Sequence, residues 1–384
     1  MHQKIKITLL LPVMFGFFIM GFIDVVGIAS NYVKQDFHLS DTVANMILMM
    51  VFIWFVLFSI PTGILMGKIG RKKTVLVSIL ITSIALFIPV LSYNFISVLV
   101  AFSFLGIGNT MLQVSLNPLL GDIVSDTKLA SSLTFGQFVK AIASFLGPIL
   151  AGGAALYLGN WRYIFPLFGG ISILAAVWLN FVKVNEPNPT KQKSTFKDSF
   201  KLLGDFTILG FFIGILLVVG IDVGLNVSIP KFLMLKGKLP LEEAGLGTSL
   251  YFVAKTSGAF FGAILLSRIQ VNKFYLVTVI FALISLIFTL FVSSLPGIYV
   301  GIFLLGLTVS NIFSIIFSKA LLHKPDYRNE ISGLMMMGIV GGAIIPIIMG
   351  LITDKLGLTA GMMVLVICMI YLLVNSLINK RELI

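Results

Sequence analysis

Four ionisable side chains stand inside long apolar stretches of the 384-residue chain: Asp24, Lys140, Asp222 and Lys255. A charge in a hydrocarbon environment costs ~2.5–3.5 kcal/mol on insertion scales, so it persists where it is paired or performs a task. Two acids and two bases can neutralise one another as ion pairs. We therefore expect Lys140 to be the charge partner of Asp24, and Lys255 that of Asp222.

These pairs have two possible roles. A static pair would only fix the packing of helices. Alternatively, desolvation favours the protonated carboxyl and a nearby lysine favours the carboxylate, so a pair that opens and closes binds and releases a proton. Both Asp24 and Asp222 are candidates for proton coupling. We prefer Asp24, because Gly21 and Gly27 leave room beside it for water or a solute, whereas Asp222 could instead orient Asn226.

Uncharged polar residues in the same apolar runs could bind a hydroxyl-rich solute, because an amide donates and accepts hydrogen bonds at once. Gln113 and Asn117 are four residues apart and so share one face of a helix. The alternative for each amide is a hydrogen bond between helices, worth ~0.6 kcal/mol on average. Trp54 offers a stacking surface for a sugar ring. The candidate substrate-binding residues are Gln113, Asn117, Asn226, Gln137 and Trp54, with Asn109 and Asn311 as weaker candidates.

The composition indicates what kind of element positions these residues. The chain is 58% hydrophobic and only 11% charged, with 34 Phe and a mean hydropathy of +1.08. Soluble domains carry about 25% charged residues, so this is the composition of a membrane protein. The net charge of +12 is distributed between the apolar runs, which argues against nucleic acid as a partner. We predict an all-α integral membrane protein.

Helices of about 20 apolar residues cross a bilayer core of ~30 Å. Counting such runs gives twelve predicted transmembrane helices. They lie at about 7–30, 42–66, 74–92, 95–119, 130–157, 162–182, 205–230, 245–267, 274–293, 296–321, 331–353 and 358–378.

The placement of Lys and Arg predicts the orientation of these spans, because cytoplasmic segments are enriched in both. With a cytoplasmic N-terminus, the inner segments hold 19 of the 27 basic residues and the outer segments six. We therefore expect both termini in the cytoplasm and a multi-pass protein of the inner membrane, in contact with lipid.

A polar segment in the middle of the chain divides it into halves. Residues 185–204 are predicted to form a cytoplasmic linker between an N-terminal six-helix bundle, residues 1–184, and a C-terminal one, residues 205–384. Within it, 196–203 could form a short amphipathic helix at the membrane surface. The halves look like copies of one another, since Ile-Asp-Val occurs at Asp24 and again at Asp222. A repeat of this kind places a binding site between the halves near the membrane midplane.

One segment carries a family resemblance. Residues 63–73, GILMGKIGRKK, resemble the loop between spans 2 and 3 of major facilitator superfamily transporters, except that Gly67 stands where an Asp is expected. The resemblance implies a gating loop formed by Gly63, Gly70, Arg71 and Lys72. From the residues alone, Arg71 to Lys73 form a lipid-facing charge cluster that sets the topology.

Further stretches are similar to the fucose/glucose–galactose:proton symporter family. They are Gln113–Pro118 (similar to Glu-x-x-x-Asn-Pro), 223–229 (similar to Val-Gly-Ala-Glu-Val-Ser-Ile) and 251–262. This chain has Gln113, Asn226 and Ala259 where that family has Glu, Glu and Arg. A sugar as substrate is implied by this resemblance.

These observations predict a secondary transporter that imports a monosaccharide-like solute with protons by alternating access. No enzyme activity, metal or cofactor is expected beyond the proton gradient, and a monomer is expected. Two alternatives stay open. Gly147–Gly153 resembles a Gly-Pro motif of proton-driven efflux antiporters for drugs or metabolites, and the buried lysines suit an anionic sugar acid.

Overall fold

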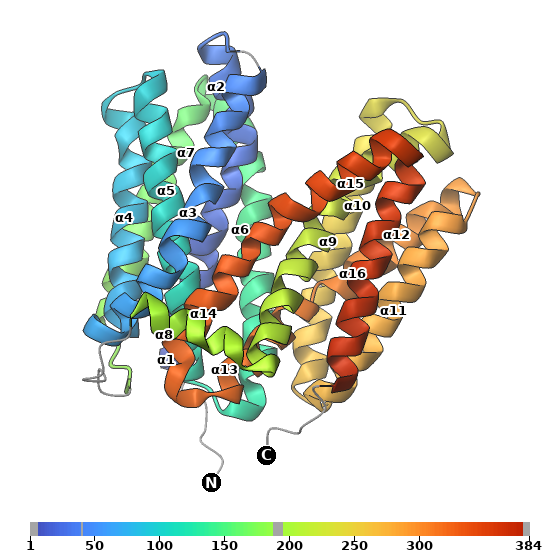
Figure 1. Ribbon diagram of the computed structural model, residues 1–384. Helices are drawn as coiled ribbons and strands as arrows, with labels where there is room; N and C mark the ends of the chain where they lie inside the picture. Colours follow the sequence, from blue (N-terminus) through green and yellow to red (C-terminus); the bar gives the residue numbers. More distant parts are fainter. Residues whose placement is uncertain (1–6, 40, 187–194, 379–384) are drawn as a thin grey trace. The chain divides into compact units, whose positions relative to one another are not determined.

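A computed structural model describes residues 7–39, 41–186 and 195–378 of the chain. The regular structure within these ranges is helical throughout (Figure 1). The chain forms two compact units. The first contains Met1–Asp126, Val139–Phe200 and Tyr327–Met337, and the second contains Thr127–Phe138, Lys201–Asp326 and Gly338–Ile384. The division into sequence halves at residues 184 and 204 stays a prediction, and residues 187–194 of the linker lie outside the described residues.

The first unit is built around α5, against which α3 and α4 pack along their length, while α7 packs on α4 and α14 on α3. Its elements are α1 (Ile7–Met20), η1 (Gly21–Val25), α2 (Val26–Asp36), α3 (Asp41–Ile69), α4 (Arg71–Leu91), α5 (Phe95–Gly121), most of α6 (Leu129–Leu158), η3 (Trp161–Tyr163), α7 (Ile164–Phe181), α8 (Phe196–Lys201) and α14 (Arg328–Met337).

The second unit is built around α9, which packs against α10, α13, α15 and α16, while α11 packs on α12 and α16. Its elements are η4 (Leu202–Gly204), α9 (Phe206–Gly237), α10 (Leu241–Leu266), α11 (Val271–Phe291), α12 (Leu295–Val309), α13 (Ile312–His323), η5 (Pro325–Tyr327), η6 (Gly338–Val340), α15 (Gly341–Leu356) and α16 (Leu358–Ile378), with the first turns of α6 and, before them, η2 (Asp126–Lys128).

Many of these helices have the length and apolar composition of membrane spans. Eleven segments of the described chain are long and apolar enough to span a bilayer, and the described part of α3 adds a shorter apolar helix, Ile53–Ile69. Only a helix or a closed barrel satisfies every backbone polar group in hydrocarbon. Large apolar side chains are correspondingly exposed on the helices, as at Leu91 (87% exposed) and Leu174 (68%). The chain is therefore an all-α, multi-pass membrane protein.

Three of the predicted spans are not continuous α-helices. The first turns into the 3₁₀ segment η1 between α1 and α2, the tenth is broken between α12 and α13, and the eleventh is broken by η6 between α14 and α15. Close packing explains the glycines at the last break. A Cβ on Gly341 would overlap the carbonyl oxygen of Leu216 on α9, so only glycine lets α15 approach α9 there.

The two halves of the sequence repeat with an offset of 200 residues. Helix α10 begins at residue 241 and α3 at 41, α11 at 271 and α4 at 71, and α12 at 295 and α5 at 95. In this register Asp222 corresponds to position 22, two residues before Asp24. Two residues are ~3 Å along a helix but about 200° around it. The two carboxylates therefore occupy nearby positions of the repeat without being strict equivalents.

Candidate functional site

Asp24 lies in η1 and is exposed. The hydroxyl of Ser144, on α6, donates a hydrogen bond to its Oδ2 over 2.5 Å and also lies 3.0 Å from the carbonyl oxygen of Lys140. Helix α6 comes close because of Gly21, where a Cβ would lie 2.5 Å from that same carbonyl oxygen. The backbone of α6 and a short serine, not a lysine side chain, thus face η1.

The expected pair of Lys140 with Asp24 is wrong for this structure. No ion pair joins the two among the described residues, and Lys140 is only half-buried. Lys140 and Ser144 share one face of α6, being four residues apart. Ser144 contacts Asp24 because its short side chain fits where the backbones of α6 and η1 approach each other.

The pair expected in the second unit is present. Lys255 Nζ lies 2.6 Å from Asp222 Oδ2, and the Tyr251 hydroxyl donates to Asp222 Oδ1 over 2.7 Å. Tyr251 and Lys255 lie on successive turns of α10, and Tyr251 is fully buried. Both oxygens of the Asp222 carboxylate therefore have a donor, and the sequence reasoning missed the tyrosine. Tyr251 is four residues before Lys255, so the two share one face of a helix, and this spacing could have indicated that both contact Asp222.

The amides of α5 form a connected row. Asn109 Nδ2 donates to the carbonyl oxygen of Met20 over 2.8 Å, Gln113 Nε2 donates to Asn109 Oδ1 over 2.6 Å, and Asn117 Nδ2 donates to the Gln113 backbone carbonyl over 2.9 Å. The bond to Met20 places the start of this row one turn from Asp24. The side-chain oxygens of Gln113 and Asn117 have no donor among the described residues, and that of Asn117 is fully buried.

The other predicted binding residues lie apart from this row. Trp54 on α3 donates its indole N–H to Ser103 Oγ over 3.1 Å and meets the ring of Phe58 edge-on. Gln137 and Asn226 belong to the second unit and are half-buried. Neither side chain makes a hydrogen bond within the described part of the chain. Their roles in binding stay predictions.

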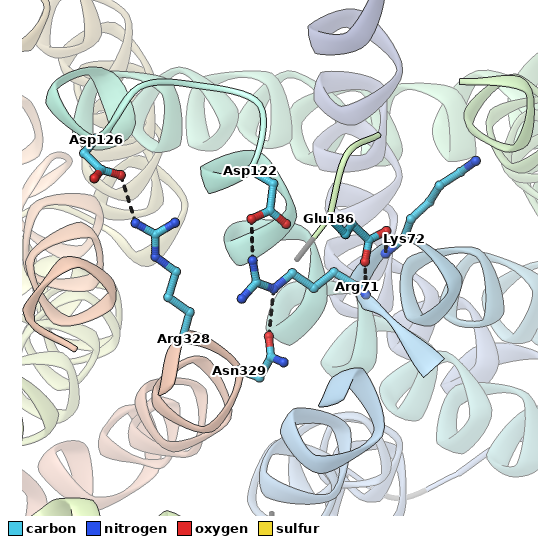
Figure 2. A network of polar contacts seen from close by, with 7 residues as sticks. All are labelled: Arg71, Lys72, Asp122, Asp126, Glu186, Arg328 and Asn329. Atoms are coloured by element: carbon cyan, nitrogen blue, oxygen red, sulfur yellow. Dashed lines mark hydrogen bonds and ion pairs between the residues drawn. The ribbon is translucent and has the colours of Figure 1, made fainter. Parts of the chain in front are cut away.

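A polar network surrounds the start of α4 (Figure 2). Gly70 precedes the helix with φ of +92°, a left-handed conformation that suits glycine. The backbone N–H groups of Arg71 and Lys72 both donate to the carboxylate of Glu186, over 2.5 and 2.9 Å. A carboxylate at a helix N-terminus satisfies free N–H groups and complements the helix dipole. Lys72 Nζ caps the end of α7, bonding the carbonyl oxygens of residues 180 and 182.

The Arg71 side chain turns inward and is buried. Its Nη1 forms an ion pair with Asp122, and its Nε donates to Asn329 Oδ1 over 2.7 Å. Arg328 Nη2 lies 2.8 Å from Asp126 in a neighbouring pair of the same unit (Figure 2). Burial raises the pKa of the Asp122 carboxyl above its usual value, and the Arg71 guanidinium counteracts this.

The expectation of a lipid-facing cluster is therefore wrong for Arg71. The missing Asp at position 67 does not leave this arginine without an acid, because Asp122 and Glu186 supply carboxylates from other parts of the chain. Gly63 has a packing role, since a Cβ there would lie 2.8 Å from the carbonyl oxygen of Asn329 on α14. The gating role of this loop stays a prediction.

Asp205 organises a smaller cluster at the start of α9. Its Oδ1 accepts from the N–H of Thr207 over 2.9 Å, and its Oδ2 lies 2.8 Å from Lys324 Nζ and 3.2 Å from His323 Nε2. Burial acts to raise the pKa of Asp205, but the bonds from Lys324, the backbone N–H of Ile208 and His323 outweigh it. They hold the pKa of this carboxyl well below its usual range.

The helical fold and its apolar spans define a multi-pass membrane protein. The model of the Major Facilitator Superfamily matches residues 10–240, more than half of the chain. The protein belongs to the Major Facilitator Superfamily. It is a transporter and not an enzyme.

Named relatives and solved structures agree with this assignment. A glucose/galactose transporter of Brucella abortus is 27% identical over 389 residues, covering 95% of this chain and 92% of that one. A hexuronate transporter of Bacillus subtilis is 25% identical over 194 residues, covering 49% of this chain and 46% of the other. A crystal structure of the E. coli fucose:proton symporter FucP superposes with a TM-score of 0.86 at 16% identity, covering 99% and 100% of the two chains, which shows the shared fold.

Proposed function

We propose that this protein imports a monosaccharide-like solute together with protons by alternating access. The observation that carries the proposal is the row of amides on α5, whose first member, Asn109, bonds to Met20, four residues before the exposed Asp24. Amides suit hydroxyl groups, and an intramembrane carboxylate suits a proton. The similarity over 95% of the chain to a glucose/galactose transporter supports a sugar as the solute.

Asp24 is the better candidate to carry the proton. The Asp222 carboxylate accepts from Lys255 and from Tyr251 at once, and its ion pair with Lys255 requires the charged form. Asp24 has a single hydroxyl donor, Ser144, which can equally accept a bond from a protonated carboxyl. Protonation of Asp24 therefore breaks no ion pair, whereas protonation of Asp222 breaks one.

Gln113 and Asn117 are the proposed sugar ligands. Their side-chain oxygens have no protein donor among the described residues, and a buried polar atom without a partner is costly. A sugar hydroxyl that donates to the Gln113 side-chain oxygen would give this oxygen the donor that the protein does not supply. Asn109 would act as a positioning residue, because it holds Gln113 in place through its own side-chain oxygen.

Uptake into proteoliposomes tests the proposal. An imposed inward pH gradient should drive glucose or galactose accumulation by the wild type. Asp24→Asn should abolish this accumulation while keeping exchange of labelled for unlabelled sugar, which needs no net proton movement. Asp222→Asn is the matched control. Accumulation that ignores the pH gradient, or full accumulation by Asp24→Asn, would refute proton coupling through Asp24. Gradient-driven dye export without sugar uptake would instead identify an efflux antiporter.

A symporter of an anionic sugar acid is the second candidate. It is favoured by Lys140, whose ammonium pairs with no carboxylate among the described residues, and by the similarity of half the chain to a hexuronate transporter. Uptake of labelled glucuronate measured beside glucose decides between the two. Preference for glucuronate that disappears in Lys140→Gln supports the sugar acid. Preference for glucose that is unchanged in this variant excludes it.

The proposal also covers the membrane in which the protein lies and the side of it that each loop faces. The excess of Lys and Arg in alternate loops supports a position in the inner membrane with both termini in the cytoplasm. The Arg71 network would then lie on the cytoplasmic side, where the loop of Gly63, Gly70, Arg71 and Lys72 would gate the inner end of the path. Labelling of single cysteines introduced at positions 68 and 355 tests this, since only the second should react from outside.

A further inference from the structure

The first unit contains a polar cavity whose lining does not include Asp24. It has a volume of 310 Å³ and lies where the end of α2, the loop after α4 and the loop between α6 and η3 meet. The loop after α4 connects the candidate spans Arg71–Leu91 and Phe95–Gly121. The loop between α6 and η3 connects the candidate spans Asp126–Leu158 and Trp161–Phe181. Loops this short between two spans lie at the membrane surface. The cavity is therefore at the level of lipid headgroups.

The two aromatic residues that line the cavity, Tyr93 and Trp161, both hold Asp36 in place. Trp161 is buried, stacks on Tyr32 with ring centroids 5.0 Å apart, and donates its N–H to Asp36 Oδ2 over 3.0 Å. The Tyr93 hydroxyl donates to the same oxygen over 2.5 Å. The Tyr93 ring centroid lies 5.1 Å from that of Phe37 and 4.2 Å from the guanidinium carbon of Arg162.

Two opposite charges remain available in the cavity. Asp36 is exposed and its Oδ1 accepts no hydrogen bond among the described residues. Arg162 is fixed by Asn160, whose Oδ1 accepts from its backbone N–H over 3.0 Å and its Nε over 2.9 Å. Its two Nη groups make no hydrogen bond in the described part of the chain, although the guanidinium lies over the Tyr93 ring. Both residues line the cavity without forming an ion pair with each other.

An unjoined carboxylate and guanidinium in one cavity fit a ligand that carries both charges. A guanidinium binds phosphate through paired N–H groups, and a carboxylate accepts from a primary ammonium. A phosphate alone would be repelled by Asp36, and an ammonium alone by Arg162. The cavity also adjoins Leu156, Tyr157 and Leu158, which are 76%, 82% and 63% exposed on the last turn of α6. An apolar ligand segment can lie against them.

We propose that this cavity binds the headgroup of phosphatidylethanolamine, with the ammonium at Asp36 and the phosphate at Arg162. A quaternary ammonium donates no hydrogen bond, and a glycerol headgroup has no positive charge, so phosphatidylcholine and phosphatidylglycerol are weaker ligands. The carboxylate beside the arginine is what selects the zwitterion with a primary amine.

Native mass spectrometry of the detergent-purified protein tests this, with the three lipids added separately at equal concentration. We expect bound phosphatidylethanolamine to exceed each of the others by roughly fivefold, the size of one partly exposed ion pair. Asp36→Asn keeps an oxygen that accepts from Tyr93 and Trp161, so the fold is retained while the preference over phosphatidylcholine is lost. Arg162→Gln should lower retention of all three lipids.

Lys355→Gln is the matched control, because Lys355 is an exposed cation in the last turn of another helix, α15. It should leave lipid retention unchanged. Equal retention of the three lipids by the wild type overturns the proposal, as does an unchanged preference in Asp36→Asn. Free phosphoethanolamine distinguishes the source of the ligand. If it raises the melting temperature while no lipid is retained, the cavity binds a soluble zwitterion and the lipid assignment is wrong.

Discussion

Replacing Arg71 by Met leaves a buried carboxylate without its counter-charge. The side chains of Arg71 and Asp122 are only 9% and 4% exposed, so water cannot replace the lost partner. Removing one member of a buried ion pair costs ~3–5 kcal/mol. Asp122 can limit this cost by taking up a proton. With an ordinary pKa of about 3.9, protonation at pH 7 costs ~4 kcal/mol.

Burial already raises the pKa of Asp122, so protonation costs less than that value. We therefore expect Arg71→Met to lower the free energy of unfolding by about 3 kcal/mol at pH 7. Removing Arg71 raises the pKa of Asp122 further. For a carboxyl whose folded pKa is raised, stability is greatest at low pH and is lost as the pH rises through that pKa. The deficit of the variant should thus shrink as the pH falls from 7 towards 5.

The assay is thermal unfolding of the detergent-purified protein at several pH values. Lys73→Met is the matched control, because Lys73 is an adjacent cation that is exposed. The double variant Arg71→Met, Asp122→Asn should recover most of the loss at pH 7, since both charges are then gone. A deficit equal to that of Lys73→Met, or a double variant less stable than Arg71→Met, would refute the buried-pair reasoning.

Two further variants test other clusters. Asp205→Ala should lower stability by about 1 kcal/mol, the usual value of an N-cap. Because the folded pKa of Asp205 is lowered, the wild type should lose this contribution as the pH falls below the usual carboxyl range, and pH-dependent melting that is the same in both proteins would contradict it. Tyr251→Phe removes a donor to the Asp222 carboxylate and should cost about 1–2 kcal/mol in thermal unfolding, against no effect for the exposed Tyr163→Phe.

The sequence predicts the helices well because a membrane span needs only length and apolarity. The span expected at 358–378 is α16, and that expected at 95–119 is α5 within two residues. The breaks were not predicted. Gly21 and Gly338 stand where 3₁₀ segments replace the α-helix, but glycines inside spans are common, and only the neighbouring backbone decides which of them marks a close approach.

The polar residues were predicted less completely for a related reason. Asp222 and Lys255 stand out in apolar runs, so their pairing could be proposed from charge alone. Asp122 and Glu186 lie at the ends of spans, where charged residues are ordinary, and nothing in the pattern marked them as partners of Arg71. Lys140 shows the opposite error. A charge in a span need not contact the nearest opposite charge when a serine and a glycine bring two backbones together.

The membership of the two units has a consequence for expressing the protein in pieces. Residues 327–337 complete the first unit, and residues 127–138 complete the second, although each segment comes from the other half of the sequence. A chain cut in the linker near residue 190 would give two fragments. Each fragment would lack a helical segment that packs within its unit but is encoded in the other half of the sequence. Neither fragment should be protease-resistant when produced alone, whereas co-expression should restore both by mutual complementation.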